Sequence, residues 1–137
     1  MATHDLCGYQ VEIDEKATRT WYADAGEWGC DCGHCRNFLE LSRNRNLPKS
    51  VMAVLNALEI PPEKATYIGE LYTDDRGIHY QFSYRIAGRI VCEFDSGHSQ
   101  VENSGRCCHE PYPYGAPGFP EPHFDLEFVE ILPWVVE

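Results

Sequence analysis

Residues 78–86 alternate without a break between apolar and polar side chains, and this alternation constrains the fold more than any other feature. Successive side chains of a strand point to opposite faces, so the pattern predicts an amphipathic β-strand with one face in a core. The polar positions, His79 among them, are expected to face water. The preceding run 73–77, Thr-Asp-Asp-Arg-Gly, is typical of a hairpin turn. We therefore expect residues 66–72 to form the antiparallel partner strand. The apolar positions of the alternation are Ile78, Tyr80, Phe82, Tyr84 and Ile86.

Four further segments have strand patterns. Residues 5–14 and 123–131 alternate between apolar and polar positions, and residues 18–22 are predicted to form a short strand. Gly88 permits a tight turn or a bulge, after which residues 89–94 would return as a separate strand. These segments and the hairpin predict an antiparallel sheet of about five or six strands.

Two segments between the predicted strands have helical periodicity. Residues 33–46 place several side chains on one face, and residues 48–58 carry the strongest helical stripe of the chain. Pro48 suits a helix start, and the pair 61–62 of prolines ends the second helix. We therefore expect an α+β fold in which two consecutive helices pack on one face of the sheet, within a single domain spanning 1–137. The positions that share a face are Cys35, Phe38, Leu39 and Ser42 in the first helix, and Val51, Val54, Leu55 and Leu58 in the second.

The charge of the chain argues against a nucleic-acid partner. Acidic residues outnumber basic ones 22 to 11, which gives a net charge of −11. Phosphate binding requires a basic surface, because neutralising phosphates supplies most of the affinity. The imbalance is largest in residues 110–137, which contain six acids and no Lys or Arg. Such a segment could attract a basic protein, or it could serve solubility alone. The six acids are Glu110, Glu121, Asp125, Glu127, Glu130 and Glu137.

The location of the protein bears on its seven cysteines. No run approaches the roughly 20 apolar residues of a membrane span, and no basic segment followed by an apolar one opens the sequence. We therefore expect a cytoplasmic protein with no membrane contact. Disulfides are rare in that reducing compartment, where clustered thiols more often indicate metal or redox chemistry.

The run Gly-Cys-Asp-Cys-Gly-His-Cys places Cys30, Cys32 and Cys35 within six residues. Zinc prefers four tetrahedral thiolate or imidazole ligands, and short glycine-containing loops let closely spaced thiolates converge. The cluster therefore predicts a structural zinc site with three thiolates from one segment. The fourth ligand is expected from Cys108, or alternatively from Cys107, His109 or His34.

The same thiols allow three other interpretations. A C-x-x-C pair at a helix start is the dithiol motif of redox proteins, and the vicinal pair 107–108 could act as its resolving partner. Zinc with three protein ligands and an open position would instead be catalytic. The thiols could also pack as small hydrophobic side chains, for which Cys35 on the apolar helix face is well placed.

Residues 111–122 form a segment rich in aromatic residues and prolines. Its prolines lack the N–H groups that a helix or a central strand requires, so we expect neither there. We expect an ordered loop in which Tyr112, Tyr114 and Phe119 provide binding contacts. The sequence contains no recognisable set of catalytic residues, so a binding or interaction domain is favoured over an enzyme. The alternative is a thiol-redox or zinc-dependent enzyme that uses the cysteine cluster.

Overall fold

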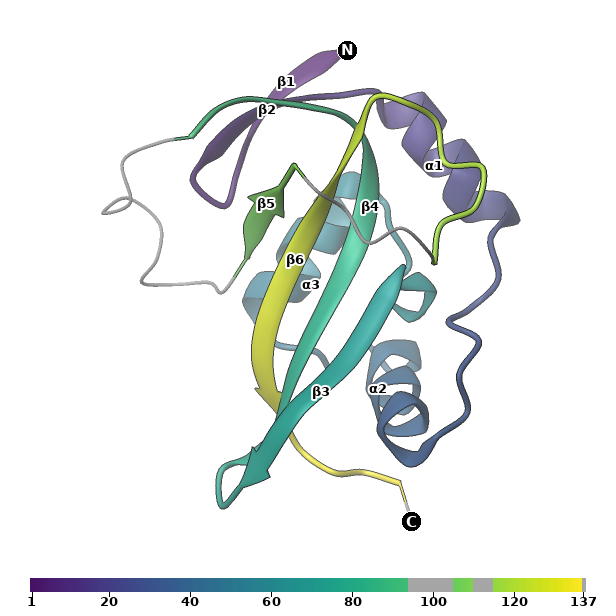
Figure 1. Cartoon of the computed structure of the whole chain (residues 1–137), viewed down its shortest axis with the longest axis vertical. Helices are drawn as coiled ribbons and strands as arrows, with labels where there is room; N and C mark the ends of the chain where they lie inside the picture. Colours follow the sequence, from purple (N-terminus) through teal and green to yellow (C-terminus); the bar gives the residue numbers. More distant parts are fainter. Residues whose placement is uncertain (94–104, 110–114, 137) are drawn as a thin grey trace.

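The computed structural model describes residues 1–93, 105–109 and 115–136. Figure 1 shows the β3, β4 and β6 ribbons in front and helix α3 behind them. The elements are, in chain order, β1 (Ala2–Leu6), β2 (Tyr9–Ile13), α1 (Glu15–Asp24), α2 (Gly33–Arg43), α3 (Lys49–Leu58), the 3₁₀ turn η1 (Pro62–Lys64), β3 (Tyr67–Asp74), β4 (Gly77–Glu93), β5 (Arg106–Cys108) and β6 (His123–Leu132).

Within these described ranges, six antiparallel strands form one sheet in the order β1-β2-β4-β6-β5, and β3 also pairs with β4. The first part of β4 lies between β3 and β6, and its last residues pair with β2. The predicted α+β class, with an antiparallel sheet of about five or six strands, is confirmed. None of the helices in the described part of the chain is both long and apolar enough to cross a bilayer.

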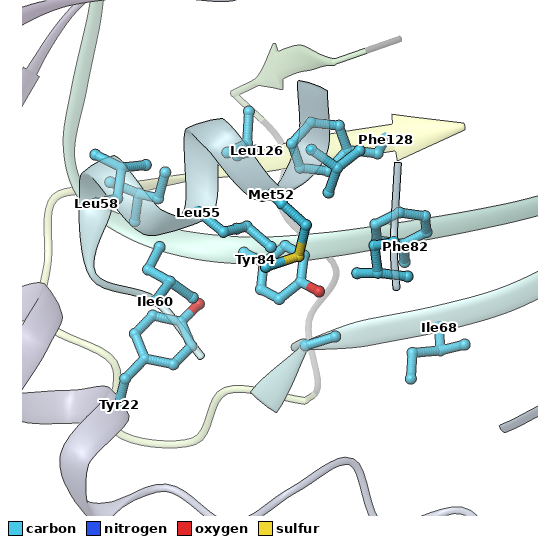
Figure 2. Close-up of a cluster of buried hydrophobic side chains, with 14 of the residues drawn as sticks. Tyr22, Met52, Leu55, Leu58, Ile60, Ile68, Phe82, Tyr84, Leu126 and Phe128 are labelled. Carbon is cyan, nitrogen blue, oxygen red and sulfur yellow. The ribbon is translucent and has the colours of Figure 1, made fainter. Parts of the chain in front are cut away.

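The buried core covers one face of β4 and contains side chains of both predicted helices. The five apolar residues of the alternation are all at most 5% exposed, as the sequence pattern predicts. The ring of Phe38 on α2 lies 4.8 Å from that of Phe82, centroid to centroid. Figure 2 shows Met52 and Leu55 of α3 beside Tyr84 in the same cluster. Full burial of one such side chain stabilises a fold by about 1.5–3 kcal/mol.

The opposite face of β4 is also partly covered, which the polar half of the alternation did not predict. Arg85 and Asp125 lie opposite one another in the β4–β6 register, and both are at most 5% exposed. The guanidinium Nε of Arg85 donates to the Asp125 carboxylate at 3.0 Å. Burial of a charged group is tolerated when a charged partner of this kind accompanies it.

The expectation that His79 faces water is wrong. His79 is 6% exposed, because the ring of Tyr72 on β3 stacks on it at a centroid distance of 4.0 Å. Its Nε2 lies 3.0 Å from the carboxylate of Asp74 at the end of β3. A neighbouring strand of the same hairpin therefore buries a histidine whose position in the alternation predicted exposure.

Residues 18–22 are helical and do not form the predicted strand. Asp14 caps α1 by accepting the backbone N–H of Ala17 at 3.0 Å, the usual role of an aspartate before a helix. Thr18 and Tyr22, four residues apart, are the two buried residues of α1. A five-residue segment is too short to distinguish a strand from one buried helical stripe, and the cap decides in favour of the helix.

The segment 5–14 forms parts of two strands and not one. Cys7 and Gly8 have φ angles of 53° and 87°, so the chain reverses between Leu6 and Tyr9, which pair across β1 and β2. Two successive positive φ values match the right-handed twist of a two-residue hairpin. Because a two-residue turn preserves the alternation, the sequence pattern hides the reversal.

Gly88 does not divide β4, which continues to Glu93, so the separate strand predicted at 89–94 is not found as such. A Cβ at Gly88 would lie 1.9 Å from the carbonyl oxygen of Glu12, and its φ is 146°. Glycine is therefore needed for the close approach of β2, and not for a turn.

We expect Asp125→Ala to lower the free energy of unfolding by about 3–5 kcal/mol, because it leaves the Arg85 guanidinium buried without its carboxylate. Urea denaturation at neutral pH measures the change. Arg89→Ala is the matched control, since it breaks a cross-strand pair with Glu12 in which the Arg89 side chain is 63% exposed. That loss should stay below about 1 kcal/mol. Equal losses in the two variants would contradict the assignment.

Asp74→Asn should be less stable than the wild type at neutral pH, and the difference should shrink in acid. Partial burial opposes ionisation, but the backbone N–H and guanidinium of Arg76, together with His79, lower the pKa of Asp74 to about 2. A carboxylate with a lowered pKa stabilises the fold above its unfolded pKa, near 4, and loses this contribution as the pH falls toward 2. Urea midpoints of both proteins between pH 2 and 6 test this, and a constant difference would refute it.

Candidate metal centre

The N-terminal end of α2 brings three thiols together. The Sγ atoms of Cys30, Cys32 and Cys35 all lie within 4.8 Å of one another. Cys32 is the residue immediately before the helix and Cys35 lies in its first turn, so the C-x-x-C spacing places both sulfurs at one helix end. Cys30 is delivered by the segment between α1 and α2. Three thiols at this separation could share one thiophilic metal ion.

The helix start stabilises a thiolate on Cys32. The first N–H groups of a helix have no partner within the helix and carry its positive end. The backbone N–H of Cys35 lowers the pKa of the Cys32 thiol below that of an ordinary cysteine, although slight burial opposes this. The thiols of Cys30 and Cys35 and the N–H of His34 act in the same direction.

Cys35 has the opposite tendency. Burial, with the neighbouring thiols of Cys32 and Cys30, raises the pKa of Cys35 to about 12. The indole N–H of Trp28 donates to its sulfur at 3.2 Å and partly opposes that rise. The cluster therefore combines one thiol that ionises readily with one that needs a cation beside it in order to ionise.

Two contacts fix the segment that carries Cys30. The ring of Trp28 packs edge-on against Tyr67 of β3, with centroids 6.2 Å apart. The carboxylate of Glu27 accepts the Nε–H of Arg43 near the end of α2 at 3.1 Å. Trp28 was given no role from the sequence, although a tryptophan two residues before the first cysteine was the available signal. Side chains that orient ligands in this way support affinity in metal sites.

The C-terminal segment fixes the other side of the helix start. A Cβ at Gly33 would lie 3.2 Å from the ring of Trp134, so the first residue of α2 lies against that ring. The side-chain amide of Asn37 donates to the carbonyl of Pro133 at 2.9 Å, and its oxygen accepts the N–H of Val135 at 2.6 Å. The helix end that carries the thiols is thus held between the segment just before it, which contains Trp28, and the C-terminal residues 133–135.

The structure does not bring the predicted fourth ligand to the cluster. Cys108 lies on β5, opposite Asp125 of β6, and His109 follows it. Cys107 is buried, and its thiol lies 3.8 Å from the carbonyl of Leu6. β5 and β3 lie on opposite sides of the β4–β6 pair, and α2 is on the β3 side (Figure 1). Strand pairing, which the sequence did not predict, therefore separates these residues from the three thiols.

The remaining alternative ligand, His34, is also outside the group. Its Nε2 lies 3.5 Å from the Glu70 carboxylate on β3, and its ring lies edge-on to that of Trp134. Among the residues that the structure describes, no fourth Cys, His, Asp or Glu has a ligand atom within this set. The described chain could thus supply three sulfur ligands to an ion.

The predicted binding aromatics divide into two groups. Tyr112 and Tyr114 lie outside the described residues. Phe119 is 6% exposed and its ring lies 4.9 Å from that of Trp21 on α1. Phe119 is therefore a core residue, and it cannot offer its ring as a contact surface as predicted.

Comparison of the chain with protein-family models, with curated proteins and with solved structures finds no match. The chemistry of the cluster is therefore inferred from its own residues. Three converging thiols, one of them with a lowered pKa, suit either a thiophilic metal ion or dithiol redox chemistry.

We expect iodoacetamide to alkylate Cys32 at least about tenfold faster than Cys35 in the folded, reduced and metal-free protein at neutral pH. The thiolate is the reacting form, and the two pKa shifts act in opposite directions. Peptide mass mapping of timed samples measures both rates, and exposed Cys92 serves as the reference. Comparable rates at Cys32 and Cys35 would contradict this description of the helix start.

Proposed function

We propose that Cys30, Cys32 and Cys35 bind a metal ion and that this ion is zinc. The mutual approach of their sulfurs to within 4.8 Å carries the proposal. Zinc is commonly held by cysteine thiolates at about 2.3 Å, and sulfurs bound to one tetrahedral ion lie within the separation found here. A cation among the thiols would also offset the cost of ionising buried Cys35.

The proposed ion would act as a cross-link between α2 and the segment before it. Cys30 belongs to residues 25–31, which contain no helix or strand, whereas Cys35 is anchored in the core. Metal binding free energy becomes folding free energy when the site does not exist in the unfolded chain. The site therefore supports a structural role in a small binding domain.

A basic protein is the proposed partner of this domain, and the net charge of −11 supports it. The carboxylates of Asp125 and Glu127 contribute little to such a surface. Both residues are at most 4% exposed and are paired with Arg85 and Arg106. Exposed acids elsewhere, such as Glu121, would have to make the contacts.

Dithiol redox chemistry is the second candidate, and the opposite pKa shifts of Cys32 and Cys35 favour it. Cys32 would attack a partner disulfide as a thiolate, and Cys35 would then displace the partner's remaining sulfur. The chain loses two electrons and gains one disulfide, and the partner leaves as two thiols. A thiol pair at a helix start is the usual setting for this exchange.

Protein purified without added metal or chelator should contain about one zinc per chain by elemental mass spectrometry. Cys32→Ser and Cys35→Ser should each reduce the content to background, because two thiolates hold zinc far more weakly than three. Circular dichroism shows whether each variant remains folded.

Cys92→Ser is the matched control, since Cys92 is an exposed thiol on β4 outside the cluster, and it should retain the metal. Cys108→Ser should retain it as well. Metal-free wild-type protein that is folded and reduced would overturn the zinc proposal. A reversible disulfide between Cys32 and Cys35 in such protein would favour the redox candidate.

A further inference from the structure

A hollow of about 310 Å³ lies next to the cysteine cluster, and Cys30 forms part of its wall. A larger groove of about 890 Å³ lies along α1. The hollow and the groove share Trp21, Gly26, Glu27 and Gly115 in their walls, so they are adjacent. The residues that line the hollow are Trp21, Gly26, Glu27, Trp28, Gly29, Cys30, Lys64, Ala65 and Gly115.

Two of the glycines that line this hollow, Gly26 and Gly29, are required neither by packing nor by backbone conformation. A Cβ built on Gly26 or Gly29 would meet no atom within 4 Å, and neither residue has a φ in the left-handed region. Gly88, by contrast, is forced by the close approach of β2. A larger side chain at Gly26 would therefore fit the fold, and it would add volume at the wall that the hollow and the groove share.

The three thiols face different surroundings. Cys35 is buried and receives the indole N–H of Trp28, so its sulfur lies toward the protein interior. Cys30 and Cys32 are exposed, and of the three only Cys30 is among the described residues that line the hollow. A fourth ligand that approaches from the hollow meets the exposed side of the cluster.

The described lining of the hollow contains one cation, Lys64, and one carboxylate, that of Glu27. The ammonium of Lys64 donates one N–H to the carbonyl of Tyr22 at 2.7 Å, and an ammonium has three such donors. The only carboxylate in the described lining, that of Glu27, is already bound by the Arg43 guanidinium. Lys64 is therefore the one lining cation, among the described residues, that could bind a carboxylate.

Resting on the proposed metal site, we propose that an external small thiol bearing a carboxylate binds in this hollow and completes the four-ligand set. Its sulfur would join Cys30, Cys32 and Cys35 on the ion, and its carboxylate would contact Lys64. A thiophilic ion with three thiolates favours a fourth soft donor. The thiol gives its proton to solvent on binding, and no electron is transferred.

Cobalt(II) replaces zinc in the test, because its absorption reports the number of bound thiolates. One equivalent is added to the metal-free full chain, reduced with a phosphine so that no other thiol is present. Titration with 3-mercaptopropionate should raise the sulfur-to-cobalt charge-transfer band by about one third, since three thiolates become four. The apparent affinity should exceed that of 2-mercaptoethanol, which lacks the carboxylate, by about fivefold.

Two pairs of variants locate the thiol. Lys64→Met should remove the preference for 3-mercaptopropionate, whereas Lys16→Met should keep it, because Lys16 lines the larger groove and is not among the described residues that line the hollow. Gly26→Leu should keep the cobalt bands and lose the response to thiol. Ala23→Leu, which adds one carbon atom fewer and lies on α1 outside the described groove lining, should keep both.

The outcomes separate the two proposals. Absence of cobalt bands in folded protein would overturn the metal site itself. Cobalt bands that do not change with either thiol, or that vanish because the thiol removes the metal, would overturn the external ligand alone. A response that is unchanged in Gly26→Leu would place the thiol outside the hollow and would likewise overturn the inference.

Discussion

The pairing of β4 with its neighbours is the constraint on which the rest of the structure depends. β4 runs from Gly77 to Glu93 and forms a ten-residue antiparallel ladder with β6. Its other side pairs with β3 and then with β2. Because each strand of the ladder satisfies the backbone groups of the next, displacement of β4 would expose N–H and C=O groups of three neighbours. The side chains of α2 and α3 pack in the core against the buried face of β4.

Contacts between α2 and the sheet fix the position of the cysteine cluster. Phe38 packs on Phe82, and the hydroxyl of Tyr80 donates to the carbonyl of His34 at 2.7 Å, so α2 is held against β4 close to its first turn. The helix end then offers its N–H groups to Cys32 at a fixed position, and Trp28 supplies a donor to Cys35 from the other side. These contacts place the groups that favour a thiolate around the cluster, and fixed surroundings of this kind would reduce the cost of binding an ion there.

The sequence predicted an element correctly where its pattern was compatible with only one type of secondary structure. The alternation over 78–86 assigned the buried face of β4 correctly, and the stripe over 48–58 located α3, because long runs have only one way to bury all their apolar side chains. It failed where short patterns are ambiguous. Residues 18–22 fit a strand and a buried helical stripe equally well, and the two-residue turn at Cys7 and Gly8 leaves the alternation of 5–14 intact.

The sequence by itself determined that Cys30, Cys32 and Cys35 lie within six residues, and it determined which side of β4 enters the core. Only the tertiary structure decided the rest. Strand order put Cys108 on the far side of the β4–β6 pair from α2, and cross-strand register joined Arg85 to Asp125 in a buried ion pair. Local spacing is fixed by covalent geometry, whereas long-range neighbours depend on the competition among all possible strand pairings, which no local pattern records.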